Sequence, residues 1–222
     1  DLHLLSRRQR QMCIRDRNLL DIAKCLRNVE KLSGVNKVEV LKELEILFAD
    51  DEMLYNNPAK KQELLENYAR ECENCTSGDT LLISIDKICE NLEHKAAWMM
   101  KNIREREWIS DGADGGWFNG YYDNHGQQVE YCRQGDVRMM LTSQVFSIMS
   151  GTAQKDQIKL ICRSADKYLY EEKAGGYRLN TDFKEEKFDL GRMFGFAYGE
   201  KENGAVFSHM AVMYSYALYK QG

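Results

Sequence analysis

The spacing of apolar residues predicts a chain built mainly of helices. From Asn18 onward, apolar side chains recur every three or four residues, which places them on one face of a helix. A similar stripe predicts a second helix over residues 38–49. Pro58 suits the first turn of a third helix that ends near Glu73, because proline has no N–H to donate there. A fourth, long helix is expected over residues 85–108, and the single proline of the chain leaves it uninterrupted.

The second half of the chain alternates helices with aromatic loops. Residues 110–116 are rich in turn residues and lead into an extended aromatic segment over residues 117–123. Residues 137–150 are apolar on almost every side, which predicts a fully buried helix. Residues 158–170 form an amphipathic partner for that helix, and residues 175–181 form a second extended loop.

The last helix is expected to begin at Asn203, a favourable capping residue, and to run through Tyr219. Helices that alternate with such loops predict an all-α fold with short β segments in the loops. In this arrangement paired helices form a ring, and the loops build a site at one end.

Composition and charge narrow the function classes. The chain has 222 residues, of which 43% are hydrophobic, enough for one domain with a substantial core. Lys and Arg total 31 against 35 Asp and Glu, so a nucleic acid or an anionic membrane is not an expected partner. No apolar run reaches the ~18 residues of a membrane span, and the charged start lacks the apolar region of a secretory signal.

The cysteine content favours reduced thiols and a cytoplasmic location. Seven cysteines cannot all pair within one chain, and the chain does not resemble a disulfide scaffold. Cys72 and Cys75 have the spacing of a zinc or redox pair. However, no second such pair and no nearby pair of histidines completes a tetrahedral site. We therefore predict no metal and no cofactor.

The first 17 residues differ from the rest of the chain. They hold five Arg and no Lys, a pattern that a nucleic-acid-binding arm would also show. The string QMCIRDR, however, resembles translated sequencing-adapter sequence. We therefore predict that residues 1–17 are a non-native segment and that residues 18–222 form the native domain.

The stretch from Lys201 to His209 is the most informative for chemistry. If Asn203 caps a helix, the backbone N–H groups of the first turn point toward an anion or a carbonyl group. Lys201 and Glu202 precede that turn and offer donors and acceptors that suit sugar hydroxyls. The same spacing also fits an ordinary capped helix whose His209 is a hydrogen-bonded core histidine.

Three ordered motifs resemble one family. K-E-N-G-x-x-F-x-H over residues 201–209 resembles the signature of the inverting glycoside phosphorylases of glycoside hydrolase family 94, which include cellobiose phosphorylase. Residues 116–126 are similar to the family's G-x-W segment, and residues 141–151 to its buried L-x-x-Q helix. Residues 177–181 and 191–198 most resemble the 1,2-β-oligoglucan phosphorylases within the family.

The resemblance implies a fold, a reaction and residue roles. The implied fold is part of an (α/α)6 barrel, a six-hairpin toroid. In the implied reaction, a β-glucan and inorganic phosphate are converted into α-glucose 1-phosphate and a shortened glucan. The only co-substrate is phosphate, and the full-length protein is compatible with a homodimer. His209 matches the family's phosphate-binding histidine, and Lys201 and Glu202 match positions that bind the acceptor sugar.

The general acid is not identified by any motif. An inverting mechanism needs one carboxylic acid, while phosphate replaces the base that would activate water. The family's D-W-N-D-type acid motif is absent here, so Asp50 and Asp51 are weak candidates, and a solvated charge cluster is the more ordinary interpretation. The chain thus resembles a fragment of the catalytic barrel, and we expect it to be inactive in isolation.

Trp117, Tyr121 and Tyr122 are candidates for stacking on pyranose rings, although residues in a short strand serve packing as often. Two other functions stay open: an inverting glucan hydrolase on the same barrel, and a non-catalytic helical binding module. Phosphate dependence separates them, since only a phosphorylase forms a sugar phosphate.

Overall fold

The structure, a computed structural model, describes residues 3–48, 50–73, 76–123, 125–185 and 190–222, with side chains from residue 16 onward. Its contacts divide the chain into two units. One comprises residues 16–99, and the other comprises residues 100–222 with the start of the chain. Each unit has its own cluster of buried apolar residues.

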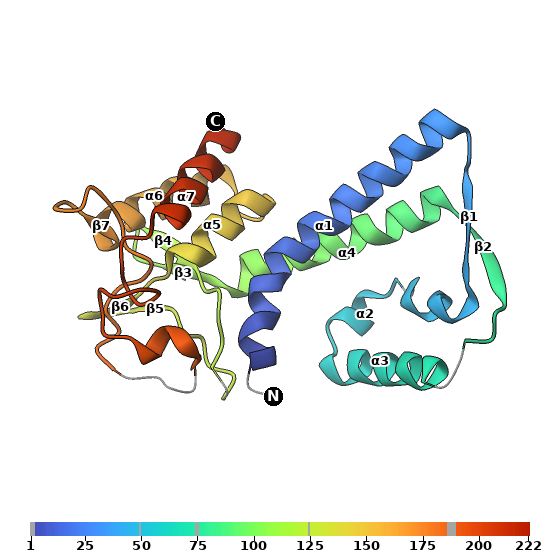
Figure 1. Ribbon diagram of the computed structural model, residues 1–222, viewed down its shortest axis with the longest axis horizontal. Coiled ribbons are helices and arrows are strands. Elements are labelled where there is room, and N and C mark those ends of the chain that lie inside the picture. Colours follow the sequence, from blue (N-terminus) through green and yellow to red (C-terminus); the bar gives the residue numbers. More distant parts are fainter. Residues whose placement is uncertain (1–2, 49, 74–75, 124, 186–189) are drawn as a thin grey trace. The chain divides into compact units, whose positions relative to one another are not determined.

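Two long antiparallel helices carry the core of the first unit (Figure 1). They are α1 (His3–Ser33) and α4 (Ile85–Arg106), and both confirm the predicted helical stripes. Ala23 on α1 packs against Ile85 and Cys89 of α4, and all three side chains are buried. Nearby, Arg27 Nη2 lies 2.8 Å from Glu93 Oε2, an exposed pair of small energetic value.

The helix predicted over residues 38–49 is wrong. The chain forms a strand, β1 (Lys37–Leu41), and a 3₁₀ helix, η1 (Lys42–Phe48). β1 pairs antiparallel with β2 (Thr80–Ser84), and Val38 lies opposite Ile83. In β1 valines alternate with charged residues, a period of two that favours a half-buried strand over a helix.

Residues 50–72 largely agree with the prediction. Helix α3 (Pro58–Cys72) begins at the proline, and the side chain of Asn57 accepts a hydrogen bond from the Lys60 N–H as its N-cap. The acidic segment is more ordered than a loop, because Asp51 caps a short helix, α2 (Glu52–Tyr55).

The second unit surrounds its core with three helices and several short hairpins (Figure 1). The antiparallel hairpins are β3 (Trp108–Ser110) with β4 (Gly116–Phe118), β5 (Tyr131–Arg133) with β6 (Asp136–Arg138), and β7 (Tyr170–Glu171) with β8 (Gly176–Tyr177). The helices are α5 (Leu141–Ser150), α6 (Lys155–Tyr168) and α7 (Ser208–Gln221), with a 3₁₀ turn, η3 (Arg192–Gly195). The core includes Trp117, Leu141, Ile148, Ile161 and Tyr214.

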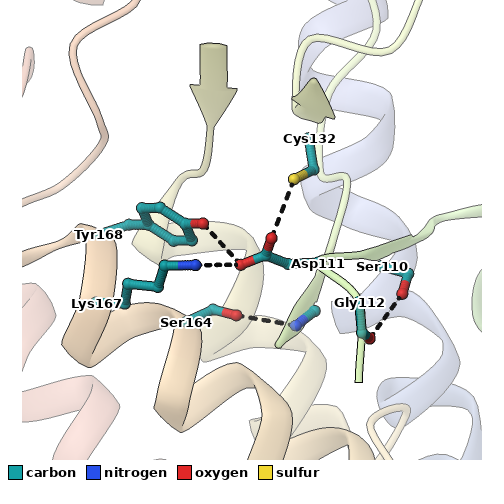
Figure 2. A network of polar contacts seen from close by, with 8 residues as sticks. Ser110, Asp111, Gly112, Cys132, Ser164, Lys167 and Tyr168 are labelled. Atoms are coloured by element: carbon teal, nitrogen blue, oxygen red, sulfur yellow. Dashed lines mark hydrogen bonds and ion pairs between the residues drawn. The ribbon is translucent and has the colours of Figure 1, made fainter. Parts of the chain in front are cut away.

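A polar network around Asp111 fastens the β3–β4 turn to α6 (Figure 2). The Asp111 carboxylate accepts hydrogen bonds from Tyr168 Oη at 2.7 Å and Lys167 Nζ at 2.9 Å, and one from Cys132 Sγ at 3.4 Å. The hydrogen bond from Tyr168 is the main reason that the pKa of Asp111 is lowered. Beside it, Ser164 Oγ accepts from the Gly116 N–H at 2.9 Å.

Two helices start later than predicted. The buried helix begins at Leu141 rather than at residue 137, because Gly135 has a positive φ and turns the chain so that β6 pairs with β5. The last helix begins at Ser208, and its N-cap is Phe207 instead of Asn203. Gly204, with φ +73°, separates Asn203 from the helix, and the Asn203 side chain has other partners.

Within the described residues, no helix has both the length and the apolar character that crossing a membrane requires.

Candidate active site

A cavity of about 430 Å³ lies in the second unit. Its wall includes the tyrosines that follow β4, the start of α5, the η3 turn and the residues around the start of α7. The lining residues include Tyr121, Tyr122, Thr142, Arg192, Glu202 and Phe207. A concave site of this size with aromatic walls and a few charged groups is typical of small-molecule binding. The lining includes three of the residues predicted from sequence, Tyr121, Tyr122 and Glu202.

The tyrosine wall depends on a close approach between the backbone and α5. A Cβ atom on Gly120 would lie only 2.0 Å from Ser143 Oγ, so glycine is required at this position. The next residue, Tyr121, accepts a hydrogen bond at its carbonyl oxygen from the Val129 N–H at 3.0 Å. The loop therefore returns against itself and presents Tyr121 and Tyr122 to the cavity.

Two buried glutamates stand behind this wall, and sequence reasoning missed both. Glu107 accepts hydrogen bonds from Tyr122 Oη at 2.9 Å and from Asn119 Nδ2 at 2.9 Å. Burial, followed by the charge of Glu107, raises the pKa of Tyr122 to about 12. The amide oxygen of Asn119, Oδ1, accepts a hydrogen bond from the Glu130 N–H at 3.2 Å.

Glu130 is fully buried and has four donors around its carboxyl group. Oε1 accepts from the Gly120 N–H at 3.1 Å and from Ser143 Oγ. Oε2 accepts from the Met140 N–H at 3.2 Å and from Gln144 Nε2 at 3.3 Å. Burial raises the pKa of Glu130 to about 8, although the hydrogen bonds from Ser143, Met140 and Gly120 act in the opposite direction. Glu130 is not among the residues that line the cavity, so its carboxyl group does not contact a ligand there.

A tight turn carries Lys201 and Glu202. Within it, the Gly199 N–H donates to the Asn203 carbonyl at 2.7 Å. Asn203 Nδ2 donates to the Phe196 carbonyl at 2.8 Å, and Asn203 Oδ1 accepts from Asn180 Nδ2 at 3.0 Å. Asn180 is buried and also accepts from the Gly204 N–H at 2.7 Å. The predicted cap residue is therefore a cross-link that places Glu202 at the cavity.

Glu202 has the chemistry of a hydroxyl-binding group. Its Oε1 lies 3.7 Å from Arg192 Nη2. Its Oε2 is buried, and no described residue donates a hydrogen bond to it. A buried acceptor without a donor is costly, and because the side chain is partly exposed at the cavity, a small rotation of the carboxylate would bring this oxygen to a ligand hydroxyl.

Lys201 and His209 lie near the cavity without lining it. Lys201 is exposed, and its ammonium group sits 4.7 Å from the centre of the Phe196 ring. His209 is exposed in the first turn of α7, and its neighbours Phe207 and Met210 line the cavity. The N-cap of α7 makes no side-chain hydrogen bond, so this helix start suits an anion. An exposed His209 does not fit the alternative of a core histidine.

Trp117 lies in the core. Its side chain is fully buried, and Nε1 donates to the Arg138 carbonyl at 3.1 Å. Stacking on a sugar requires an exposed ring face, so this placement favours the packing role.

Asp50 and Asp51 belong to the other unit. Asp50 accepts from Tyr55 Oη at 2.8 Å and contacts His94 Nδ1 at 2.7 Å. Burial tends to raise the pKa of Asp50, but the hydrogen bonds from His94 and Tyr55 outweigh it and lower the pKa. A general acid needs the opposite shift. Asp51 caps α2 through its own carboxylate.

The described side chains include no group of three or more His, Cys, Asp or Glu arranged for a metal ion. Cys75, half of the sequence pair with Cys72, lies outside the described residues. The described cysteines Cys25, Cys72, Cys89, Cys132 and Cys162 are free thiols.

Two known proteins resemble part of the chain. A solabiose phosphorylase of Paenibacillus borealis is 29% identical over 108 residues, which cover 48% of this chain and 14% of that relative. An N,N'-diacetylchitobiose phosphorylase of Vibrio proteolyticus is 29% identical over 113 residues, 50% of this chain and 14% of that relative. The matched stretch thus spans about a seventh of either relative's length.

A family model, the catalytic domain of the glycosyl hydrolase 94 superfamily, matches residues 83–222, which include every residue that lines the cavity. Because this match covers more than half of the chain, the chain belongs to the glycosyl hydrolase 94 superfamily through its catalytic domain.

Proposed function

We propose that this chain contributes to an inverting glycoside phosphorylase that converts a β-glucan or β-glucooligosaccharide and phosphate into α-glucose 1-phosphate. The observation that carries the proposal is Glu202, whose buried carboxylate oxygen has no described hydrogen-bond donor and whose side chain lines the cavity. The aromatic wall beside it offers surfaces for the apolar faces of a sugar.

The chain's own residues divide the work of binding. Glu202 accepts hydrogen bonds from acceptor-sugar hydroxyls, Tyr121 packs against the sugar, and Lys201 contributes positive charge from the same turn. His209 and the open start of α7 bind phosphate, which is the nucleophile. Because phosphate is already an anion, the site needs donors that hold it rather than a base.

The proton donor is assigned to neither Asp50 nor Glu130. The hydrogen bonds of Asp50 favour its charged form, and Glu130 does not reach the cavity. Turnover therefore needs an acid beyond those that line the described cavity, and we propose that residues 18–222 alone bind ligands without phosphorolysis.

We further propose that residues 18–222 are part of an (α/α)6 barrel, supported by the family match and the mainly helical chain. The free thiols among the described residues support a cytoplasmic location. The segment over residues 191–198, which resembles 1,2-β-oligoglucan phosphorylases, supplies Arg192 and Phe194 to the cavity wall. Oligosaccharides with 1,2-β linkages are thus the first substrates to test. We also propose that the full-length protein is a homodimer.

Isothermal titration calorimetry of the chain with 1,2-β- and 1,4-β-glucobiose, with and without phosphate, tests the proposal. We expect binding by the wild type. Because a hydrogen bond to a charged group contributes roughly 1.5–3 kcal/mol, Glu202→Gln should bind about tenfold to a hundredfold more weakly. Glu105→Gln is the matched control, since Glu105 is exposed and does not line the cavity.

Equal binding by both variants would remove Glu202 from the site. A wild type that binds no glucoside would contradict the proposal and favour the helical binding module. Release of free sugar without phosphate would favour a hydrolase.

A further inference from the structure

The walls of the cavity come from segments that are not adjacent in sequence. Tyr121 and Tyr122 follow strand β4, whereas Met140 and Thr142 stand at the start of α5. Gly120, which precedes Tyr121, has no side chain that could pack, so only its backbone can hold this point of the loop. The position of the tyrosines therefore depends in part on what binds the Gly120 N–H, beside the hydrogen bonds from the Val129 N–H to Tyr121 and from Tyr122 to Glu107.

The Glu130 carboxyl group binds both walls at once. Its Oε1 accepts from the Gly120 N–H at 3.1 Å, on the loop side. Its Oε2 accepts from the Met140 N–H at 3.2 Å, on the α5 side. Met140 is the N-cap of α5 but makes no side-chain capping hydrogen bond, so Glu130 serves the helix start in place of a local cap.

We propose that Glu130 is a positioning residue, which sets the distance between the tyrosine wall and α5 and thereby the sugar affinity of the cavity. This inference rests on the proposed function, because it concerns the same cavity. Glu130 acts through Gly120 and Tyr121 and does not touch the ligand.

The ionised and neutral forms of Glu130 hold the walls differently. The carboxylate accepts from all four donors. The neutral acid must donate its proton, and Ser143 Oγ is the partner that can accept it, which leaves a weaker acceptor for the Gly120 N–H. The charged group behind the wall that acts on Glu130 is Glu107, which is linked through Asn119, whereas Ser143 and Gln144 on α5 do not titrate in this range. Sugar affinity should therefore rise with pH as Glu130 ionises.

Glu130→Gln isolates the loop-side contact. A glutamine can still accept from Met140 and Gln144 and donate to Ser143, but its amide N–H₂ faces the Gly120 N–H, so that one hydrogen bond is lost. Removal of one typical hydrogen bond corresponds to about twofold to tenfold weaker binding of 1,2-β-glucobiose. The wild-type rise of affinity between pH 6 and pH 9 should vanish in this variant.

Ser164→Ala is the matched control. It also removes a buried hydrogen bond to a backbone N–H of the same segment, that of Gly116, but Ser164 lies on α6 and does not line the cavity. We expect this variant to melt earlier than the wild type while it keeps wild-type affinity and pH profile.

Ser143→Ala keeps the test open if Glu130→Gln does not fold. The hydrogen bond from Ser143 favours the charged form of Glu130, so its loss should move the midpoint of the affinity profile to higher pH. Wild-type affinity and profile in Glu130→Gln, an unmoved midpoint in Ser143→Ala, or equal weakening in Ser164→Ala would overturn the inference alone. A wild type without glucoside binding would overturn the proposed function as well.

Discussion

At the scale of residues, the site depends on polar groups whose partners are unusual. Glu202 has a buried oxygen without a described donor, and Asn203 cross-links its turn to Asn180. The Glu202 oxygen carries a cost in stability, because a buried polar atom without a partner is unfavourable in the free protein, whereas the hydrogen bonds of Asn203 are satisfied and hold the turn. A bound ligand would supply the hydrogen bond that the Glu202 oxygen lacks in the free protein.

Replacement of the exposed His209 by Asn should weaken phosphate binding. The hydrogen bond from an imidazole to an anion is worth roughly 1.5–3 kcal/mol, so phosphate affinity should fall about tenfold to a hundredfold. Because His209 is exposed, the melting temperature should stay unchanged. Calorimetry with phosphate and thermal unfolding check the two parts. An early-melting variant with normal phosphate binding would remove His209 from the site.

Glu130 should make the protein less stable as pH rises. The pKa of Glu130 is raised in the folded state from the ordinary value of 4.5 to about 8. Between these values the folded protein binds more protons than the unfolded chain, so the free energy of unfolding falls as pH increases. Thermal unfolding from pH 5 to pH 8 should show a decreasing melting temperature that Glu130→Gln flattens.

His94 also lowers the free energy of unfolding as pH rises, over part of the range from pH 5 to pH 8. Its hydrogen bond to Asp50 raises the pKa of His94 above 6.5, so its stabilisation is present below that pH and is lost as pH rises through the folded-state pKa. A His94→Gln variant separates the two groups. If the slope survives in Glu130→Gln and vanishes in His94→Gln, Glu130 is not its source.

At the scale of elements, the periodicity of the local sequence and pairing with a distant strand compete to decide the structure of a segment. Helices α1, α3, α4 and α6 follow from their apolar spacing and caps, because their hydrogen bonds join residues four apart. Strand β1 lies in the segment predicted as a helix, since its partner strand β2 lies about forty residues away in sequence. Helix α7 starts five residues later than predicted, because Asn203 serves the turn instead of the helix.

Removal of residues 1–17 tests the beginning of α1. The helix runs without a break from His3 to Ser33, yet we predict that the first 17 residues add no stability to the domain. Urea unfolding of residues 18–222 should match that of the whole chain. A loss above about 1 kcal/mol, the size of a typical damaging substitution, would show that the segment packs natively.

At the scale of the whole molecule, the chain has a binding cavity, but none of its described residues is assigned as the proton donor. We therefore expect no α-glucose 1-phosphate when the chain is incubated with 1,2-β- or 1,4-β-glucooligosaccharides and phosphate. The same preparation should bind glucoside, which shows that the protein is folded. Robust turnover would restore Asp50 or Asp51 as the candidate acid.

The sequence by itself determined the helical class, the family and three residues beside the cavity. Lys201, Glu202 and His209 stand in one contiguous motif, so their mutual proximity follows from chain connectivity. Of the three stacking candidates, Tyr121 and Tyr122 line the cavity, but the sequence could not tell them from Trp117. All three are aromatic residues of one extended segment, and only packing places the Trp117 ring in the core and the two tyrosines at the cavity.

Only the tertiary structure revealed the roles of Glu107, Glu130 and Asn180, whose side chains are buried. Glutamate and asparagine are common surface residues, and no pattern in the neighbouring sequence indicates that these are buried. Their roles come from donors elsewhere in the chain, as the Gly120 and Met140 N–H groups do for Glu130. Burial and hydrogen-bond satisfaction are properties of the packed chain, so a periodic sequence pattern cannot contain them.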